Sequence, residues 1–326
     1  MSHRFFRTLN DRERDGINDR AQTLAQMLLQ WAAGYSVTRH RRVPSVALLT
    51  AACVPRIPPH DALPTMKLSF WEFGIDDIAD ERQVSQSELE SLARHFGSLA
   101  GGHPPTPQAN RDELSAMLHE VRGDLARYPL FASLGEAWAQ EVERFVMAMA
   151  FEYRYGSSFR KAGPETLPSL EEYLSWTLYS IGIPLWALAI WIAADDASIL
   201  KCLEPVWEAT RHASIAVRLL NDLRTYRKEI EEQSVNAVLI AGHADATGNA
   251  GPIPGEQALA GAVERLKQLV DTHCQLCLDA AGRVRTDSGM VEETLARTAL
   301  FHADFYGGGE DYNTTSLSQV GQLLTS

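Results

Sequence analysis

Residues 206–232 read V-W-E-A-T-R-H-A-S-I-A-V-R-L-L-N-D-L-R-T-Y-R-K-E-I-E-E, with apolar residues at helical spacing. Within this stretch Asn221, Thr225 and Glu229 follow one another at intervals of four residues. On an α-helix that interval places three oxygen-bearing side chains on one stripe, each about 6 Å further along the axis. Asn and Thr are mediocre helix formers, so their place inside a long helix indicates a function.

An earlier acidic stretch, Asp76-Asp77-Ile78-Ala79-Asp80, ends a helix predicted over residues 67–81. Asp76 and Asp80 share a helix face, and carboxylates at a helix C-terminus oppose the macrodipole. An acidic string of this kind is by itself commonly a solvated helix end. Oxygen-only ligands, however, suit Mg²⁺, which prefers a few protein carboxylates together with substrate phosphates. Two such stripes facing each other would clamp a diphosphate between metal ions.

The composition excludes several classes of partner. A net charge of −12 argues against nucleic acid or an anionic membrane surface as the main partner. The most apolar run, residues 181–194, has 14 residues and contains Pro184, whereas a membrane span needs roughly 20. The N-terminus mixes Arg with acidic residues and has no apolar signal-peptide core, and a reducing cytosol fits four scattered cysteines. We therefore expect a cytoplasmic enzyme.

Helical periodicity dominates the chain, and Gly/Pro-rich loops separate the periodic segments without resembling domain linkers. We expect a single all-α domain over residues 1–326, with about ten to twelve helices around one core. Residues 1–16 are expected to be a flexible segment, and residues 307–326 a tail that caps the site. Cys274 and Cys277 look like half a zinc site, but no second pair exists and the surrounding pattern is helical, so we expect them to pack in the core.

At this point the chain resembles a class I terpene synthase over nearly its whole length. Asp76 to Asp80 match the aspartate-rich motif of that family, and Asn221, Thr225 and Glu229 match its second metal motif. Finer features resemble bacterial relatives of plant ent-kaurene-type diterpene synthases. These features are Arg218-Leu-Leu-Asn221-Asp222 followed by Asn236-Ala237-Val238, then Glu172-Tyr173-Leu174 with Ser180-Ile181-Gly182, and the late stretch Phe305 to Tyr312.

Two departures concern the residues that bind diphosphate. Ser175, Trp176 and Thr177 stand where many bacterial sesquiterpene synthases carry a diphosphate-sensing Arg, and Phe305 replaces the Arg of their late Arg-Tyr pair. These departures favour the plant-like diterpene subgroup. Candidates for diphosphate binding are Arg218, Arg227, Lys228 and Tyr306, with Arg224, Arg39 and Arg41 as further basic residues, although a charged helix face is usually just solvated.

The resemblance implies three Mg²⁺ ions held by Asp76 and Asp80 on one side and by Asn221, Thr225 and Glu229 on the other. It implies that these metals assist departure of the diphosphate, leaving an allylic cation in a pocket that excludes water. Asp77 is expected to hold a basic partner instead of a metal. Asp222 sits about 100° around the helix from Asn221, so Asp222→Asn is expected to matter less than Glu229→Gln.

The pocket below the metals is expected to be apolar and aromatic, because π faces stabilise cations without acting as nucleophiles. Pro184 removes a backbone donor and Gly182 precedes it, so we expect a helix break there that helps to steer the cation. Aromatic core packing is the competing interpretation for the ring residues. The candidate cavity residues are Phe73, Trp176, Tyr179, Ser180, Ile181, Gly182, Ile183 and Trp186.

The preferred function is ionisation of a copalyl-type bicyclic diphosphate and conversion of its cation to a diterpene hydrocarbon or alcohol. The chain has no D-x-D-D protonation motif, so a separate class II diterpene cyclase is expected upstream. The alternative is cyclisation of linear geranylgeranyl or farnesyl diphosphate. A chain-elongating prenyltransferase would want a second D-D-x-x-D motif, and a non-catalytic helical interaction protein, the minor alternative, would not need the intact ligand set. A homodimer is a further expectation.

Overall fold

The computed structural model describes residues 5–81, 84–103, 112–245, 251, 253–308, 310 and 312–313; for Asp80 it describes the backbone alone. The described residues form α-helices and short 3₁₀ turns, and no strand occurs among them. The α-helices are α1 (Phe5–Thr8), α2 (Asp11–Ala32), α3 (Val43–Cys53), α4 (Pro59–Asp80), α5 (Gln86–Ala100), α6 (Glu113–Leu125), α7 (Phe131–Ala162), α8 (Leu170–Ser180), α9 (Ile183–Ala194), α10 (Leu203–Glu231), α11 (Ala237–Asp245), α12 (Glu256–Ala281) and α13 (Met290–Gly307).

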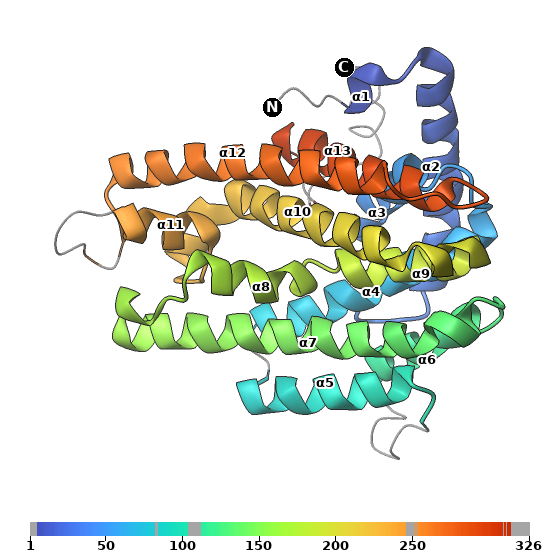
Figure 1. The fold of residues 1–326 in the computed structure, drawn as a ribbon. Helices are drawn as coiled ribbons and strands as arrows, with labels where there is room; N and C mark the ends of the chain where they lie inside the picture. Colours follow the sequence, from blue (N-terminus) through green and yellow to red (C-terminus); the bar gives the residue numbers. More distant parts are fainter. Residues whose placement is uncertain are drawn as a thin grey trace.

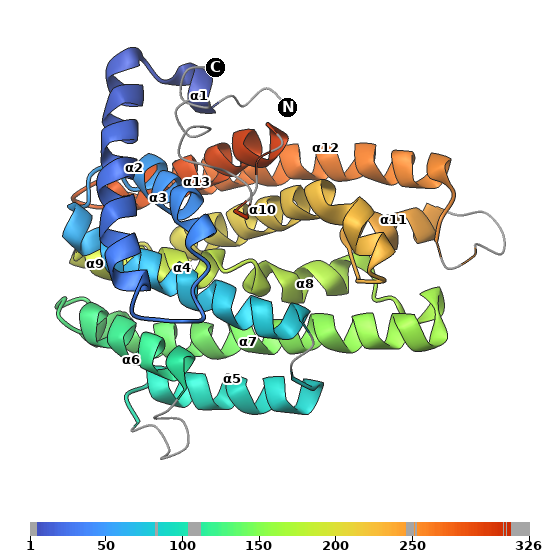
Figure 2. The same ribbon diagram turned by 180° about the vertical axis from the view of Figure 1, so that it is seen from behind.

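The long helices lie roughly side by side in one bundle. Figure 1 shows α12, α10, the α8–α9 pair, α7 and α5 following one another across the molecule. Seen from behind, α2 crosses the ends of α3 and α4 at one side of this bundle (Figure 2). α10 packs against α12 and α13 on one side and against α8 and α9 on the other. The helix that bears the second motif is therefore central, with neighbours on both sides.

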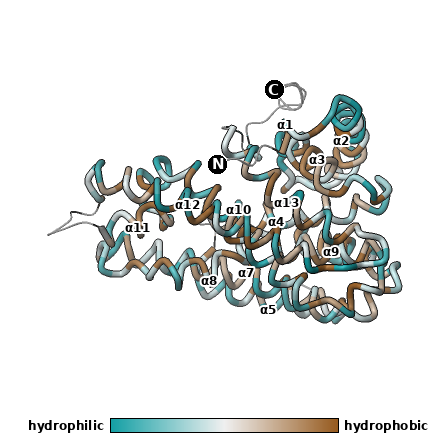
Figure 3. Tube along the Cα trace, turned by 45° about the horizontal axis from the view of Figure 1, so that its top comes forward, coloured by the Kyte–Doolittle hydropathy of each residue, from teal (hydrophilic) through white to brown (hydrophobic). Residues whose placement is uncertain are grey.

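The helices differ in how much of their surface is buried. α5 is amphipathic and begins with a capping box, in which Ser85 and Glu88 satisfy each other's backbone N–H groups. α9 is instead apolar on all sides, and every residue from Ile183 to Ala193 is buried. Hydrophobic positions fall mainly on the inner sides of the helices, whereas much of α2 is hydrophilic (Figure 3). α9 is thus a core helix that the bundle surrounds.

The expected break between α8 and α9 lies at Gly182. Its φ is 77°, a left-handed conformation that glycine adopts without strain, and Pro184 follows in the first turn of α9. Residues 170–194 together are long and apolar enough to span a membrane, but 83% of the apolar window is buried inside the protein. A core helix pair passes the same test, and the break at Gly182 interrupts the span.

Residues 5–16, expected to be flexible, are helical apart from a short turn between α1 and α2. Phe5 and Phe6 are buried edge-on against Phe301 of α13, and the Phe6 N–H donates to Asp304. Two aromatic rings therefore pack the start of this segment against α13. Residues 1–4 of the expected segment, and most of the expected tail from 309 onward, lie outside the described residues.

Candidate active site

The first motif occupies the last turns of α4. Asp76 is half-buried there, while Asp77 is held by two arginines. Arg42 donates to both carboxylate oxygens of Asp77 at 2.9 Å, and Arg39 Nε lies 2.8 Å from Oδ2. The planar guanidinium of Arg42 is itself buried and also packs over the Phe73 ring at 4.5 Å. The two arginines thus fix the end of α4 and offset negative charge beside Asp76.

The second motif lies inside α10, and all three of its side chains are half-buried. Thr225 donates its hydroxyl to the backbone carbonyl of Asn221 at 2.9 Å. The Asn221 amide lies 3.5 Å from the Tyr306 hydroxyl on α13. Glu229 accepts a 2.7 Å hydrogen bond from Asn236 at the start of α11. The expected stripe therefore exists as three oxygen-bearing side chains on one helix, with its lower end supported by α11.

Burial and the nearby Asp222 carboxylate raise the pKa of Glu229 to about 7. A half-buried carboxylate next to a second carboxylate is costly to ionise, and a bound cation would remove that cost. Carboxylate, amide and hydroxyl oxygens on one stripe are also ligands that Mg²⁺ accepts. Among the described residues, no group of three His, Cys, Asp or Glu side chains could hold a metal by themselves. The donor chemistry of this stripe fits a hard divalent cation.

Asp222 faces away from the stripe into a buried ionic network. It is fully buried, forms an ion pair with Arg218 at 2.5 Å, and accepts hydrogen bonds from the Tyr173 hydroxyl and the Ala237 backbone N–H, both at 3.0 Å. Arg218 also lies 3.4 Å from Glu152 on α7. The network joins α7, α8, α10 and α11 behind the metal stripe. Sequence position indicated only that Asp222 faces away from the ligands, not that it organises this core.

The basic candidates for diphosphate binding lie in three different settings. Arg218 is only 7% exposed and is committed to Asp222 and Glu152, so direct contact with a diphosphate would require it to leave a buried ion pair. Lys228 is exposed and pairs with Glu232, and Arg227 lies over the Tyr226 ring. Tyr306 is placed beside Asn221.

Glu72 was missed by the sequence interpretation, although it lies one helical turn before Asp76. Its carboxylate would be 2.9 Å from a Cβ placed on Gly182, so a side chain at the break would have to displace the carboxyl group in addition to adopting a left-handed φ of 77°. One of its oxygens is buried without a hydrogen-bond partner, and desolvation raises its pKa well above the usual range. A neutral carboxyl group therefore packs against the backbone of the break. The available signal was the interval of four residues between Glu72 and Asp76, which places both carboxyl groups on one face of α4.

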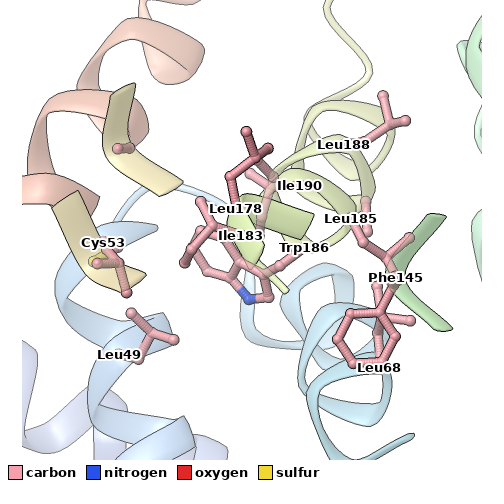
Figure 4. Close-up of a cluster of buried hydrophobic side chains, with 14 of the residues drawn as sticks. Leu49, Cys53, Leu68, Phe145, Leu178, Ile183, Leu185, Trp186, Leu188 and Ile190 are labelled. Atoms are coloured by element: carbon pink, nitrogen blue, oxygen red, sulfur yellow. The ribbon is translucent and has the colours of Figure 1, made fainter. Parts of the chain in front are cut away.

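The expected cavity residues do not all gather in one place. Phe73 packs against Tyr312 with ring centroids 5.6 Å apart, and Trp186 and Ile183 are buried on α9. Figure 4 shows Ile183 and Trp186 extending from α9 toward Cys53 and Leu49 of α3. Trp176, in contrast, is 38% exposed and stacks on Phe151.

The three remaining cavity residues lie at the α8–α9 junction. Ser180 donates its hydroxyl to Glu152 and is buried, while Ile181 is half-buried at the end of α8. Tyr179 lines a cleft of about 460 Å³ between α7, α8, α9 and α10, with the Arg144 guanidinium over its ring. No residue of either metal motif lines this cleft, so it does not mark the metal site.

A chain of contacts across the bundle joins the two metal motifs. Asn221 of α10 contacts Tyr306, whose ring centroid lies 6.2 Å from that of Tyr312. Tyr312 in turn packs on Phe73, which lies one turn before Asp76. Asn313, the next residue, accepts a 2.9 Å hydrogen bond from Arg42. The described part of the C-terminal tail thus returns between α4 and α13, and its side chains connect the helix of the first motif to that of the second.

His302 anchors this returning tail from α13. It is 1% exposed, its Nδ1 lies 2.8 Å from the Thr298 carbonyl, and its Nε2 lies 2.8 Å from the Tyr312 hydroxyl. Burial lowers the pKa of His302 to about 4, because an imidazolium would be desolvated there. The imidazole is therefore neutral at physiological pH.

This burial predicts a pH-dependent contribution to stability. A histidine whose pKa falls from about 6.5 to about 4 on folding stabilises the protein fully above pH 6.5, by about 3 kcal/mol, and this is lost as the pH falls toward 4. The free energy of unfolding of wild type relative to His302→Phe should therefore decrease between pH 7 and pH 4. Urea unfolding at several pH values measures the difference in the free energy of unfolding between wild type and His302→Phe. A difference that does not change with pH would contradict a neutral buried His302.

Comparison with known proteins identifies relatives of the chain. Residues 67–275 match the family model described as terpene synthase family 2, C-terminal metal binding. The chain is 26% identical over 225 residues to ent-pimara-9(11),15-diene synthase from a Streptomyces strain, which covers 65% of this chain and 71% of that protein. It is 30% identical over 115 residues to isopimaradiene synthase from Isodon rubescens, covering 33% of this chain but only 13% of that longer protein.

A solved structure shares the fold. The 2-methylisoborneol synthase from Streptomyces coelicolor, in complex with Mg²⁺ and geranyl-S-thiolodiphosphate, superposes with a TM-score of 0.66 at 16% identity. The match covers 87% of this chain and 90% of that one. The family match spans both acidic motifs, from Lys67 on α4 to Gln275 on α12, and so includes every expected metal ligand. The chain belongs to the terpene synthase family.

Proposed function

We propose that the chain is a Mg²⁺-dependent class I diterpene synthase that ionises a copalyl-type bicyclic diphosphate and converts its cation to a diterpene hydrocarbon or alcohol. The observation that supports the proposal most is the pairing of the α10 stripe with the end of α4 through Tyr306, Tyr312 and Phe73. Two relatives are named as pimaradiene synthases, which favours a diterpene substrate.

The residues proposed to hold the metal ions, three by the family resemblance, are Asp76, Asp80, Asn221, Thr225 and Glu229. When bound, these ions would supply Lewis-acid assistance to the leaving diphosphate. The protein's own part is to hold the ligands in place: Arg42 and Arg39 fix Asp77 at the end of α4, and Arg218 with Asp222 fixes α10. Aromatic side chains such as Phe73 and Trp186 would exclude water from the cation.

The substrate assignment is tested with a panel of diphosphates. Purified protein is incubated with Mg²⁺ and copalyl, ent-copalyl, geranylgeranyl or farnesyl diphosphate, and products are read by gas chromatography. Turnover of a bicyclic diphosphate alone supports the proposal and requires a separate class II cyclase as its source. Cyclisation of a linear diphosphate would instead support the alternative function, and turnover of none would reject both. Cytoplasmic location and a homodimer remain part of this proposal.

Turnover should depend strictly on a divalent metal. The proposed ligands are all oxygen atoms, so chelation with EDTA is expected to abolish product formation and excess Mg²⁺ to restore it. Circular dichroism in EDTA provides the control that the fold persists. Full activity in EDTA would exclude metal-assisted ionisation.

Product identity is expected to depend on the break between α8 and α9. Ile181→Thr, Ile183→Thr and Ser180→Ala change no group that binds metal, so they should alter the product mixture while substrate consumption stays within about tenfold of wild type. Competing cation pathways need differ by only about 1.4 kcal/mol to change a product ratio tenfold. Product profiles are compared with that of Phe73→Ala. An unchanged mixture in all three would move control of cyclisation to another wall of the pocket.

A further inference from the structure

We propose that Tyr312 and His302 form the proton-accepting pair that ends the cation cascade, with Tyr312 as the catalytic residue and His302 as the group that receives its proton. This inference rests on the proposed function, because it needs a carbocation in the pocket. It gives a catalytic role to a residue of the tail and a supporting role to a buried histidine, and neither residue belongs to a metal motif.

The hydrogen bonds of His302 fix where its proton lies. A backbone carbonyl can only accept, so the 2.8 Å contact with Thr298 requires the proton on Nδ1. Nε2 then carries a lone pair, and the Tyr312 hydroxyl, 2.8 Å away, donates to it. The pair is therefore set with the phenolic proton already directed toward a base and with oxygen lone pairs left on Tyr312.

Tyr312 lies among aromatic rings that lead to both metal motifs. Its ring packs on Phe73 at 5.6 Å, on Phe305 at 5.2 Å and near Tyr306 at 6.2 Å. Phe73 leads to the first metal motif and Tyr306 to Asn221 of the second. Aromatic faces attract a cation, and the Tyr312 oxygen is a polar atom among these rings.

The pair is uncharged before the cation appears. Burial lowers the pKa of His302 to about 4. Burial also raises the pKa of Tyr312 well above its usual range, and the nearby ionisable groups of Tyr306, Cys53 and Glu72 raise it further. Tyr312 is therefore not a phenolate, which would trap the cation as an ether. Both groups are far more basic than the alkene that the cation forms on losing a proton, so proton transfer to them is strongly downhill.

The step balances without any further reactant. The C–H bond next to the cationic carbon breaks, and its electron pair forms the C=C bond of the product. The proton goes to the Tyr312 oxygen while the phenolic O–H bond breaks and that proton moves to Nε2 of His302. The cation becomes a neutral alkene, Tyr312 is regenerated, and His302 becomes an imidazolium that returns its proton to water before the next turnover.

The test compares Tyr312→Phe and His302→Phe with wild type, using the diphosphate that wild type consumes in the panel. Both variants keep an aromatic ring at their position; Tyr312→Phe removes the oxygen that accepts the proton, and His302→Phe removes the nitrogen that receives the tyrosine's own proton. We expect the principal wild-type alkene to fall at least tenfold as a share of total product, replaced in both variants by the same isomers or by an alcohol. Substrate loss, which reports ionisation, should fall less than tenfold. The double variant should resemble either single one, because the two residues act as a unit.

Tyr128→Phe serves as the matched control, since it removes a tyrosine hydroxyl that, outside the proposed site, donates to Asp61; its product mixture should equal that of wild type. Reduced substrate consumption with unchanged product ratios in Tyr312→Phe would show that Tyr312 has only a structural role and would overturn the inference. Different product sets from the two single variants would overturn it too. If wild type consumes no diphosphate, the proposed function itself fails, which is a separate outcome.

Discussion

Replacing Glu229 by Gln or Asn221 by Ala should lower kcat by at least about a hundredfold, equivalent to about 2.7 kcal/mol of transition-state stabilisation. Each change removes one oxygen ligand or one charge from the α10 stripe. The fold should persist, because the glutamine amide would keep an oxygen that accepts from Asn236 and would replace a carboxylate whose ionisation burial disfavours. Steady-state kinetics across a Mg²⁺ titration measures both the loss and the weaker metal binding.

The matched control for this pair of variants is Glu231→Gln, which removes an exposed carboxylate two residues further along the same helix. It should leave kcat and the Mg²⁺ dependence close to wild type. If Glu231→Gln were as damaging as Glu229→Gln, the loss would reflect general charge near the end of α10, and the assigned ligand stripe would be rejected.

Asp222→Asn should lower the free energy of unfolding by about 3–5 kcal/mol, because it breaks a buried ion pair from one side. Arg218 would keep Glu152 at 3.4 Å but lose its 2.5 Å ion pair, because a neutral amide cannot replace the charge of the carboxylate. The Asn oxygen could still accept from Tyr173 and Ala237, which both donate to Oδ2 of Asp222. Urea unfolding measures the effect. Asp279→Asn, at a position on the surface side of α12 where Asp279 accepts from Gln275, should change the stability by less than about 0.5 kcal/mol.

The two variants should therefore have opposite effects on turnover and on stability. Glu229→Gln should affect turnover more than stability, whereas Asp222→Asn should affect stability more than the turnover of the enzyme that stays folded. A large stability loss in Glu229→Gln with none in Asp222→Asn would reverse the roles of these neighbouring carboxylates. The helical offset of about 100° between residues 221 and 222 predicts that Asp222 does not share the role of the ligand stripe. The complete burial of Asp222 explains why its replacement should cost so much stability.

Local features of the site could be predicted from the sequence because covalent geometry fixes them. A four-residue interval on a helix places Asn221, Thr225 and Glu229 on one stripe whatever surrounds them. Gly182 and Pro184 likewise predict a break, because glycine can adopt a left-handed backbone conformation and proline lacks a backbone N–H donor. The all-α class follows from the same periodicity, and the family model spans both motifs.

Contacts between distant segments were decided only by the tertiary structure. Nothing local to Trp176 shows that it stacks on Phe151 and stays partly exposed, and nothing local to Arg218 shows that it is buried with Glu152 and Asp222. Likewise, nothing within residues 5–16 shows that the rings of Phe5 and Phe6 pack on Phe301 of α13.

Pairings of this kind depend on which apolar surfaces the whole bundle buries together, and one helix's periodicity does not contain that information. Tyr312 meets Phe73 across 239 residues of chain, and Glu72 meets Gly182 across 110, because packing brings α4, α9 and the returning tail to the same place. The sequence alone determined which residues could bind metal and where the helix breaks. Packing decided which groups surround them, since burial and charge pairing depend on neighbours from every part of the chain.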